Sequence, residues 1–125
     1  MNILQAQALG PAVLLDDHKL NPAKWTHERI VRSIIDFEKK LDETLEIGLR
    51  LVSFSNAEVI HINDVGYWGP DLVIFYGRNS LNHPVELIQH ITQVSVLLVA
   101  MPKEGEEARR IGFDLEAKLN KPSNG

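Results

Sequence analysis

The hydrophobic period of the chain changes from helical to strand-like near residue 45, and this change restricts the fold more than any other feature. Residues 21–42, NPAKWTHERIVRSIIDFEKKLD, carry apolar side chains at i, i+4, i+7 and i+11 counted from Ile30, which form one helical stripe. Asn21 is a good N-cap, and Pro22 fits the first helical position. The segment therefore predicts an amphipathic helix that covers one face of a sheet.

The residues after 45 alternate with the period of strands. LEIGLRLVSF (45–54) and AEVIHIND (57–64) predict two strands of a hairpin, with a Ser-Asn turn between them. VGYWGPD (65–71) is punctuated by glycine and proline and predicts a loop or a sharp bend. DLVIFYG (71–77) is apolar on both faces and predicts a central strand. RRIGFDLE (109–116) alternates again and predicts a last strand.

Residues 84–93, PVELIQHITQ, fit two structures. Proline at the start suits a helix, but the turn before it reads as a hairpin loop, so we favour a strand. In a strand, Gln89 and Gln93 face one way, and His90 and Thr92 face the other. We then expect the glutamines to satisfy buried backbone groups, which leaves His90 and Thr92 to meet a ligand.

The most apolar run, VSVLLVAMP (94–102), predicts either the central strand or an exposed seam that pairs with a second copy. The apolar arm at residues 1–20 packs across its own domain or docks on a partner subunit. Together they favour a homo-oligomer. The expected organisation is this arm, one domain at residues 21–119 and a polar tail at residues 120–125.

These elements predict an α+β fold, in which the N-terminal amphipathic helix packs on a bent, mainly antiparallel sheet of five or six strands, or on a small open barrel. The length of 125 residues is that of one ordinary domain.

Composition excludes several classes of function. The net charge of −4 disfavours binding to long nucleic acids, which requires clustered Lys and Arg. The absence of cysteine removes thiolate nucleophiles and cysteine zinc sites, and fits a reducing compartment. The N-terminus lacks the pattern of a signal peptide, and no apolar run approaches ~20 residues. We therefore expect a cytoplasmic protein without membrane association.

The histidines give two weak catalytic candidates, His61 and His90. His61 could bind a metal with Asn63 and Asp64, but scattered histidines are the simpler interpretation, so we expect no metal and no cofactor. The tripeptides HIN (61–63) and HIT (90–92) partly match the two His-x-Thr/Ser motifs of a phosphodiesterase. They lie 29 positions apart.

The candidate binding residues are aromatic, basic or polar. Tyr67 and Trp68 are framed by glycines and could stack on a base or anchor a protein partner. Arg78 and the pair Arg109-Arg110 could hold an anion. The predicted ligand-binding or partner-binding set is Tyr67, Trp68, Arg78, His90, Thr92 and Arg110.

Five blocks carry a resemblance to a known family: NPAKWTHERIV, LRLVSF, HINDVGYWGPDLVIFYG, VELIQHITQVSVLLVAMPK and RRIGF. In order and spacing they resemble a family of small bacterial or phage-encoded proteins classed as a domain of unknown function. The resemblance covers residues 21–114 and leaves the N-terminal arm outside. It implies a compact cytosolic domain and no particular chemistry.

The favoured function is a non-enzymatic, self-associating binding or assembly module. One alternative is a binder that sequesters a small nucleotide-like ligand, with Trp68 or Tyr76 on the base, Gln89 and Gln93 at its edge, and Arg78 or Arg110 on the phosphate. The other alternative is a histidine-dependent phosphodiesterase or hydrolase.

Overall fold

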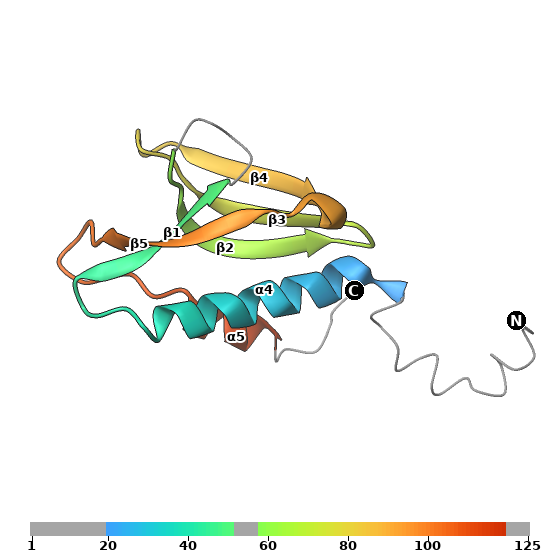
Figure 1. Ribbon diagram of the computed structural model, residues 1–125, viewed down its shortest axis with the longest axis horizontal. Helices are drawn as coiled ribbons and strands as arrows, with labels where there is room; N and C mark the ends of the chain where they lie inside the picture. The colour runs from blue at the N-terminus through green and yellow to red at the C-terminus, as the bar shows by residue number, and fades with distance from the viewer. Residues whose placement is uncertain (1–19, 52–57, 120–125) are drawn as a thin grey trace, which may run out of the picture.

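The computed structural model of the chain describes residues 20–51 and 58–119, and these form an α+β fold. The predicted arm up to residue 19, the predicted Ser-Asn turn of the hairpin and the tail at residues 120–125 lie outside the described residues. The described elements, in chain order, are α4 (Pro22–Glu38), β1 (Leu45–Leu51), β2 (His61–Trp68), β3 (Leu72–Arg78), β4 (Pro84–His90), the 3-10 turn η1 (Ile91–Gln93), β5 (Val96–Pro102) and α5 (Gly112–Leu119). Figure 1 shows both helices on one side of the strands.

Helix α4 begins as its sequence predicts. The Asn21 side chain accepts the Lys24 backbone N–H at 3.3 Å, and Pro22 follows at the first helical position. Ile34 is fully buried, as predicted, whereas the other members of the predicted stripe are partly buried. The buried side of α4 also carries two polar residues, His27 and Glu38. Their hydrogen-bond partners lie far along the chain.

The strands form two antiparallel sheets, and neither closes into a barrel. One sheet pairs β1 with β5, and the other is the meander β2-β3-β4, in which β3 is central as predicted. One isolated bridge joins them: the backbone N–H of Leu49 and of Ile60 each donates to the carbonyl of the other at 2.8 Å. Within the described residues, the two segments of the predicted hairpin (45–54 and 57–64) meet at this bridge, and β1 pairs with β5 along its whole length.

Two segments differ from their predicted type. Residues 65–68, predicted as a loop or bend, continue β2 to Trp68, and the turn is confined to residues 69–71. The glycine at position 66 is tolerated there because the Tyr76 ring lies over it, within 3.2 Å of where a Cβ would be. Residues 112–116, predicted as part of a strand, instead belong to helix α5, because Ile111 and Leu115 are also spaced by one helical turn.

The structure also differs from the predictions for the two apolar segments after residue 83. β4 ends at His90, and residues 91–93 form η1, so the predicted strand 84–93 is right only for its first seven residues. Residues 96–102 form β5, which pairs only with β1 among the described strands. The interpretation of 94–102 as the central strand is therefore wrong, because β5 lies at a sheet edge.

The core lies between the helices and the inner faces of both sheets. Val31 and Ile34 of α4 meet apolar side chains from three strands and from the start of α5. The buried apolar cluster is Val31, Ile34, Ile47, Leu49, Ile62, Val65, Val73, Phe75, Ile111 and Leu115. One helix thus supplies a common packing surface for both sheets.

Candidate functional site

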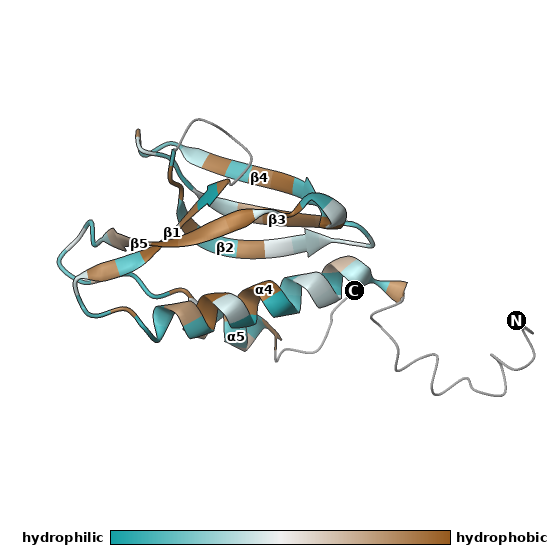
Figure 2. Ribbon diagram, in the orientation of Figure 1, coloured by the Kyte–Doolittle hydropathy of each residue, from teal (hydrophilic) through white to brown (hydrophobic). Residues whose placement is uncertain are grey.

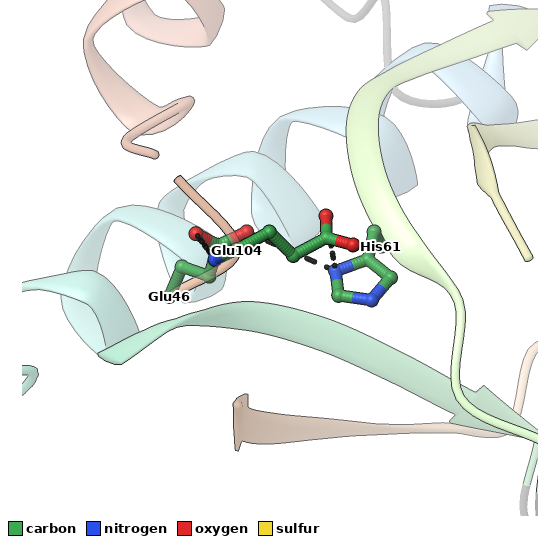
Figure 3. A group of neighbouring side chains, drawn as sticks. All are labelled: Glu46, His61 and Glu104. Atoms are coloured by element: carbon green, nitrogen blue, oxygen red, sulfur yellow. Dashed lines mark hydrogen bonds and ion pairs between the residues drawn. The ribbon is translucent and has the colours of Figure 1, made fainter. Parts of the chain in front are cut away.

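A polar cluster occupies the junction of the two sheets. Glu46 comes from β1, His61 begins β2, and Glu104 lies in the loop after β5. His61 Nδ1 is 3.3 Å from Glu104 Oε1 and 3.8 Å from Glu46 Oε2. Figure 3 shows the imidazole ring with both carboxylates turned toward it. The junction therefore gathers three groups that can bind a proton or a cation.

Arg109 contacts the cluster on its buried side. Its guanidinium donates to the carbonyls of Ile62 at 2.6 Å and Ile47 at 3.3 Å, and also to Asn63 Oδ1. Its Nη2 lies 3.3 Å from Glu46 Oε2. Because Glu46 is only 2% exposed, this pairing compensates a carboxylate that burial would otherwise destabilise strongly.

The backbone and a second arginine complete the cluster. Glu46 Oε1 accepts the N–H groups of Glu104 at 3.3 Å and Arg109 at 3.4 Å. Arg78 Nη2 lies 3.7 Å from Glu104 Oε1, and Arg78 also donates to Asn82 Oδ1 at 3.0 Å. The junction therefore gathers four residues singled out from the sequence, His61, Asn63, Arg78 and Arg109. His61 and Arg78 are also opposite each other in the β2–β3 register.

His90 lies at the far end of the same sheet. It is opposite Leu72, whereas His61 is opposite Arg78. These two residues of β3 are six positions apart in the sequence, which corresponds to roughly 20 Å along a strand. His90 Nδ1 is 2.8 Å from Thr92 Oγ1, and its Nε2 is 3.6 Å from Asp71. His90 and Thr92 thus come together as predicted, but His61 and His90 are too far apart to act on one phosphate.

The predicted role of the glutamines is only partly right. Gln89 donates from Nε2 to the Gln93 carbonyl at 3.5 Å, a long hydrogen bond within an exposed turn. Its Oε1 is buried and has no hydrogen-bond partner among the described residues. Gln93 is exposed, because η1 turns it away from the face that the strand pattern assigned to it.

The outer face of β2-β3-β4 carries large apolar residues at the end of the sheet near Trp68. Directly opposite residues of antiparallel strands share a face, so Trp68, Leu72 and His90 form one row and Gly66, Ile74 and Ile88 form the next. Trp68 is 71% exposed and Ile88 57% exposed. Figure 2 shows brown, hydrophobic segments along β4, the strand drawn farthest from the helices. This face is the one turned away from the buried Val65, Val73 and Phe75.

Tyr67 lies on the opposite face from Trp68, toward α4. Its ring centroid is 5.1 Å from that of His27. His27 Nε2 lies 2.8 Å from the Val65 carbonyl, which can only accept, so Nε2 carries the hydrogen. Burial lowers the pKa of His27 below 6.5, although the bond to Val65 and the nearby Asp64 oppose this shift. Tyr67 and Trp68 therefore cannot contact one ligand on the same face.

The basic residues proposed to hold a phosphate are also separated from Trp68. Arg78 is at the other end of β3, and Arg110 donates to the carbonyls of Leu45 at 2.7 Å and Asp42 at 2.8 Å. Arg110 thus ties the turn after α4 to the segment before α5. Among the described residues, Arg78 and Arg110 thus have partners other than Trp68, and the ligand-binding role of these residues stays a prediction.

Glu46 and Glu104 are the members of the junction that sequence reasoning missed. Glu46 stands in the apolar run LEIGLRL, and a buried charge in a strand is itself unusual. Glu104 is one of several acidic residues in KEGEEA and has no distinguishing local pattern. Neither pattern connects these residues to His61.

Comparison with known proteins places the chain in a family without assigning an activity. No curated protein and no solved structure matches it. Within the described residues, no helix has the length and apolar character needed to cross a membrane. A family model matches residues 14–114, which confirms the resemblance carried by the five sequence blocks and extends it into the N-terminal arm. The chain therefore belongs to the family of unknown function DUF6173.

Proposed function

We propose that the protein is a non-enzymatic binding module that self-associates through the outer face of β2-β3-β4. The observation that carries the proposal is the exposure of Trp68 and Ile88 on one face of a sheet. No described helix or strand covers this face. Large apolar residues gathered on one exposed face are typical of interaction sites.

The arrangement of this face suits a second copy of the chain. Trp68, Leu72, Ile74 and Ile88 supply apolar surface, and Glu86 and His90 stand at the edge formed by β4. An apolar centre with a polar rim is the usual anatomy of a protein interface. A two-fold axis places the same patch on both partners, and an apolar patch is complementary to itself.

The expected association is weak. Three strands ~4.8 Å apart and seven residues long offer roughly 330 Å² of flat sheet area. Standard interfaces bury ~800 Å² on each partner. We therefore expect a dimer that forms at micromolar protein concentrations and dissociates on dilution.

Analytical ultracentrifugation across micromolar concentrations tests the proposal. The variants Trp68→Glu and Ile88→Glu should remain monomeric, because each places a carboxylate within the apolar patch. Leu81→Glu is the matched control, since Leu81 is also 71% exposed but lies in the β3–β4 turn. A wild-type protein that stays monomeric, or a Trp68→Glu dimer as stable as the wild type, would refute self-association through this face.

A further inference from the structure

The polar junction between the sheets has the geometry of a metal site. One imidazole nitrogen and one oxygen from each of two carboxylates lie within 4.8 Å of one another. In a tetrahedral zinc site the ligand atoms stand roughly 3.4 Å apart, because each is ~2.1 Å from the metal. The observed separations of 3.3 Å and 3.8 Å around His61 Nδ1 are close to this value.

His61 gives a second, independent reason to expect a bound ion. The residue is only 9% exposed, and its Nδ1 is buried without a hydrogen-bond partner among the described residues. This nitrogen points at two carboxylate oxygens (Figure 3). When Nδ1 carries a lone pair, it and the oxygens repel one another unless a cation lies between them. Buried polar atoms are normally satisfied, and a metal ion would satisfy all three groups at once.

From these observations we propose that Glu46, His61 and Glu104 bind one divalent transition-metal ion of the zinc class. His61 supplies the nitrogen ligand, and the two glutamates supply one oxygen each. Glu104 belongs to a loop and is half exposed, so it closes the site from the solvent side. Three protein ligands leave a further coordination position for water or another ligand.

The neighbouring arginines decide which cations the site accepts. Arg109 lies 3.3 Å from Glu46 Oε2, and Arg78 lies 3.7 Å from Glu104 Oε1. The two guanidinium groups offset the charge of the two carboxylates, and this weakens the attraction for any cation. Mg²⁺ and Ca²⁺ depend on charged oxygen ligands and have little affinity for imidazole. Zn²⁺ gains from the imidazole bond, so the site should prefer it, with micromolar rather than nanomolar affinity.

A bound ion would also connect the two sheets. Glu46 belongs to β1 and Glu104 follows β5, whereas His61 belongs to β2. Among the described strands, the backbone link between the sheets is the bridge at Leu49 and Ile60. Because an ion that binds the folded state stabilises it, the melting temperature should rise with the concentration of Zn²⁺.

Isothermal titration of the metal-free full chain with ZnCl2 tests the proposal, and MgCl2 is titrated in parallel. We expect one Zn²⁺ per chain and no saturable heat from Mg²⁺. Glu104→Gln should weaken Zn²⁺ binding about tenfold or more without affecting folding, because Glu104 is exposed. His61→Gln should have the same effect and should also change the visible absorption of bound Co²⁺.

The matched control is the surface histidine His90, which also lies near a carboxylate, Asp71. His90→Ala should bind Zn²⁺ as the wild type does. The proposal is overturned by the absence of saturable Zn²⁺ binding to the wild type, by unchanged binding in Glu104→Gln, or by loss of binding in His90→Ala.

Discussion

Glu38, the last residue of α4, caps the first turn of α5 by accepting the backbone N–H of Gly112 at 2.7 Å. Its other oxygen accepts the N–H of Ile111 at 2.9 Å. These residues are 74 and 73 positions from Glu38. A carboxylate at a helix N-terminus satisfies free N–H groups and interacts favourably with the helix dipole. Here it does so while buried.

Replacing this carboxylate should destabilise the fold. Glu38→Gln puts an amide NH2 where one N–H donor needs an acceptor, and leaves a buried donor unsatisfied. The free energy of unfolding should fall by about 1–3 kcal/mol. Urea denaturation measures this change, and Glu116→Gln, an exposed change on α5, is the control. Equal stability of the two variants would show that the cap contributes nothing.

His27 should make the stability depend on pH. Its pKa in the folded protein is lowered from 6.5, chiefly by burial. Below pH 6.5 the unfolded chain therefore binds a proton at His27 that the folded chain disfavours. The contribution of neutral His27 to the free energy of unfolding is complete above pH 6.5 and is lost as the pH falls below that value. The melting temperature should therefore decrease as the pH is lowered below 6.5.

The variant His27→Gln separates this effect from other titrations. A glutamine amide can still donate to the Val65 carbonyl but does not titrate, so the decrease below pH 6.5 should become smaller. His83→Gln, which replaces an exposed histidine, is the control for the substitution itself. A His27→Gln protein with the wild-type pH profile would assign the effect to other groups.

Gly77 lies where β3 closely approaches the start of β2. A Cβ at this position would overlap the carbonyl oxygen of His61 and come within 2.7 Å of the Ile60 side chain. Gly77→Ala should therefore destabilise the protein by about 1–3 kcal/mol. The overlapping oxygen belongs to the backbone of His61, so a change of side-chain rotamer cannot relieve the overlap. Gly105→Ala, whose Cβ would meet nothing within 4 Å, should be neutral. Thermal denaturation of both variants distinguishes them.

Arg109 should contribute more to stability than an ordinary surface arginine. Arg109→Ala leaves the buried Glu46 carboxylate without its counter-charge, at an expected cost of about 3 kcal/mol. Arg32→Ala, an exposed change on α4, should cost little. Glu46→Gln combined with Arg109→Ala should lose less than the sum of the single losses. Additive losses in denaturation would mean that the two residues do not interact.

The parts of the fold that the sequence predicted are those with local causes. Asn21 and Pro22 start α4 by interactions within one turn, and the apolar run at residues 71–77 is enough to identify a central strand. Gly66 shows the limit of such reasoning. Its position suggested a bend, but it lies within β2 with the Tyr76 ring of the neighbouring strand packed closely over it, which the local sequence does not reveal.

The same limit explains the errors at α5 and at the junction. Ile111, Phe113 and Leu115 fit both a strand and a helix over so short a segment, and the Glu38 cap that favours the helix lies more than seventy residues away. Glu46 approaches Glu104 because β1 pairs with β5. His61 was identified as a candidate, but its partners depend on strand pairing that hydrophobic periodicity does not specify.

In the part of the chain that the structure describes, one isolated bridge joins the two sheets, and this has a consequence for cooperativity. β1-β5 and β2-β3-β4 share few backbone hydrogen bonds, yet both pack on α4. Each sheet loses its core when that helix separates, so both are expected to unfold at one midpoint. Amide protons of the two sheets should then exchange with solvent through the same global opening, and a substitution at Val31 or Ile34 would accelerate exchange in both.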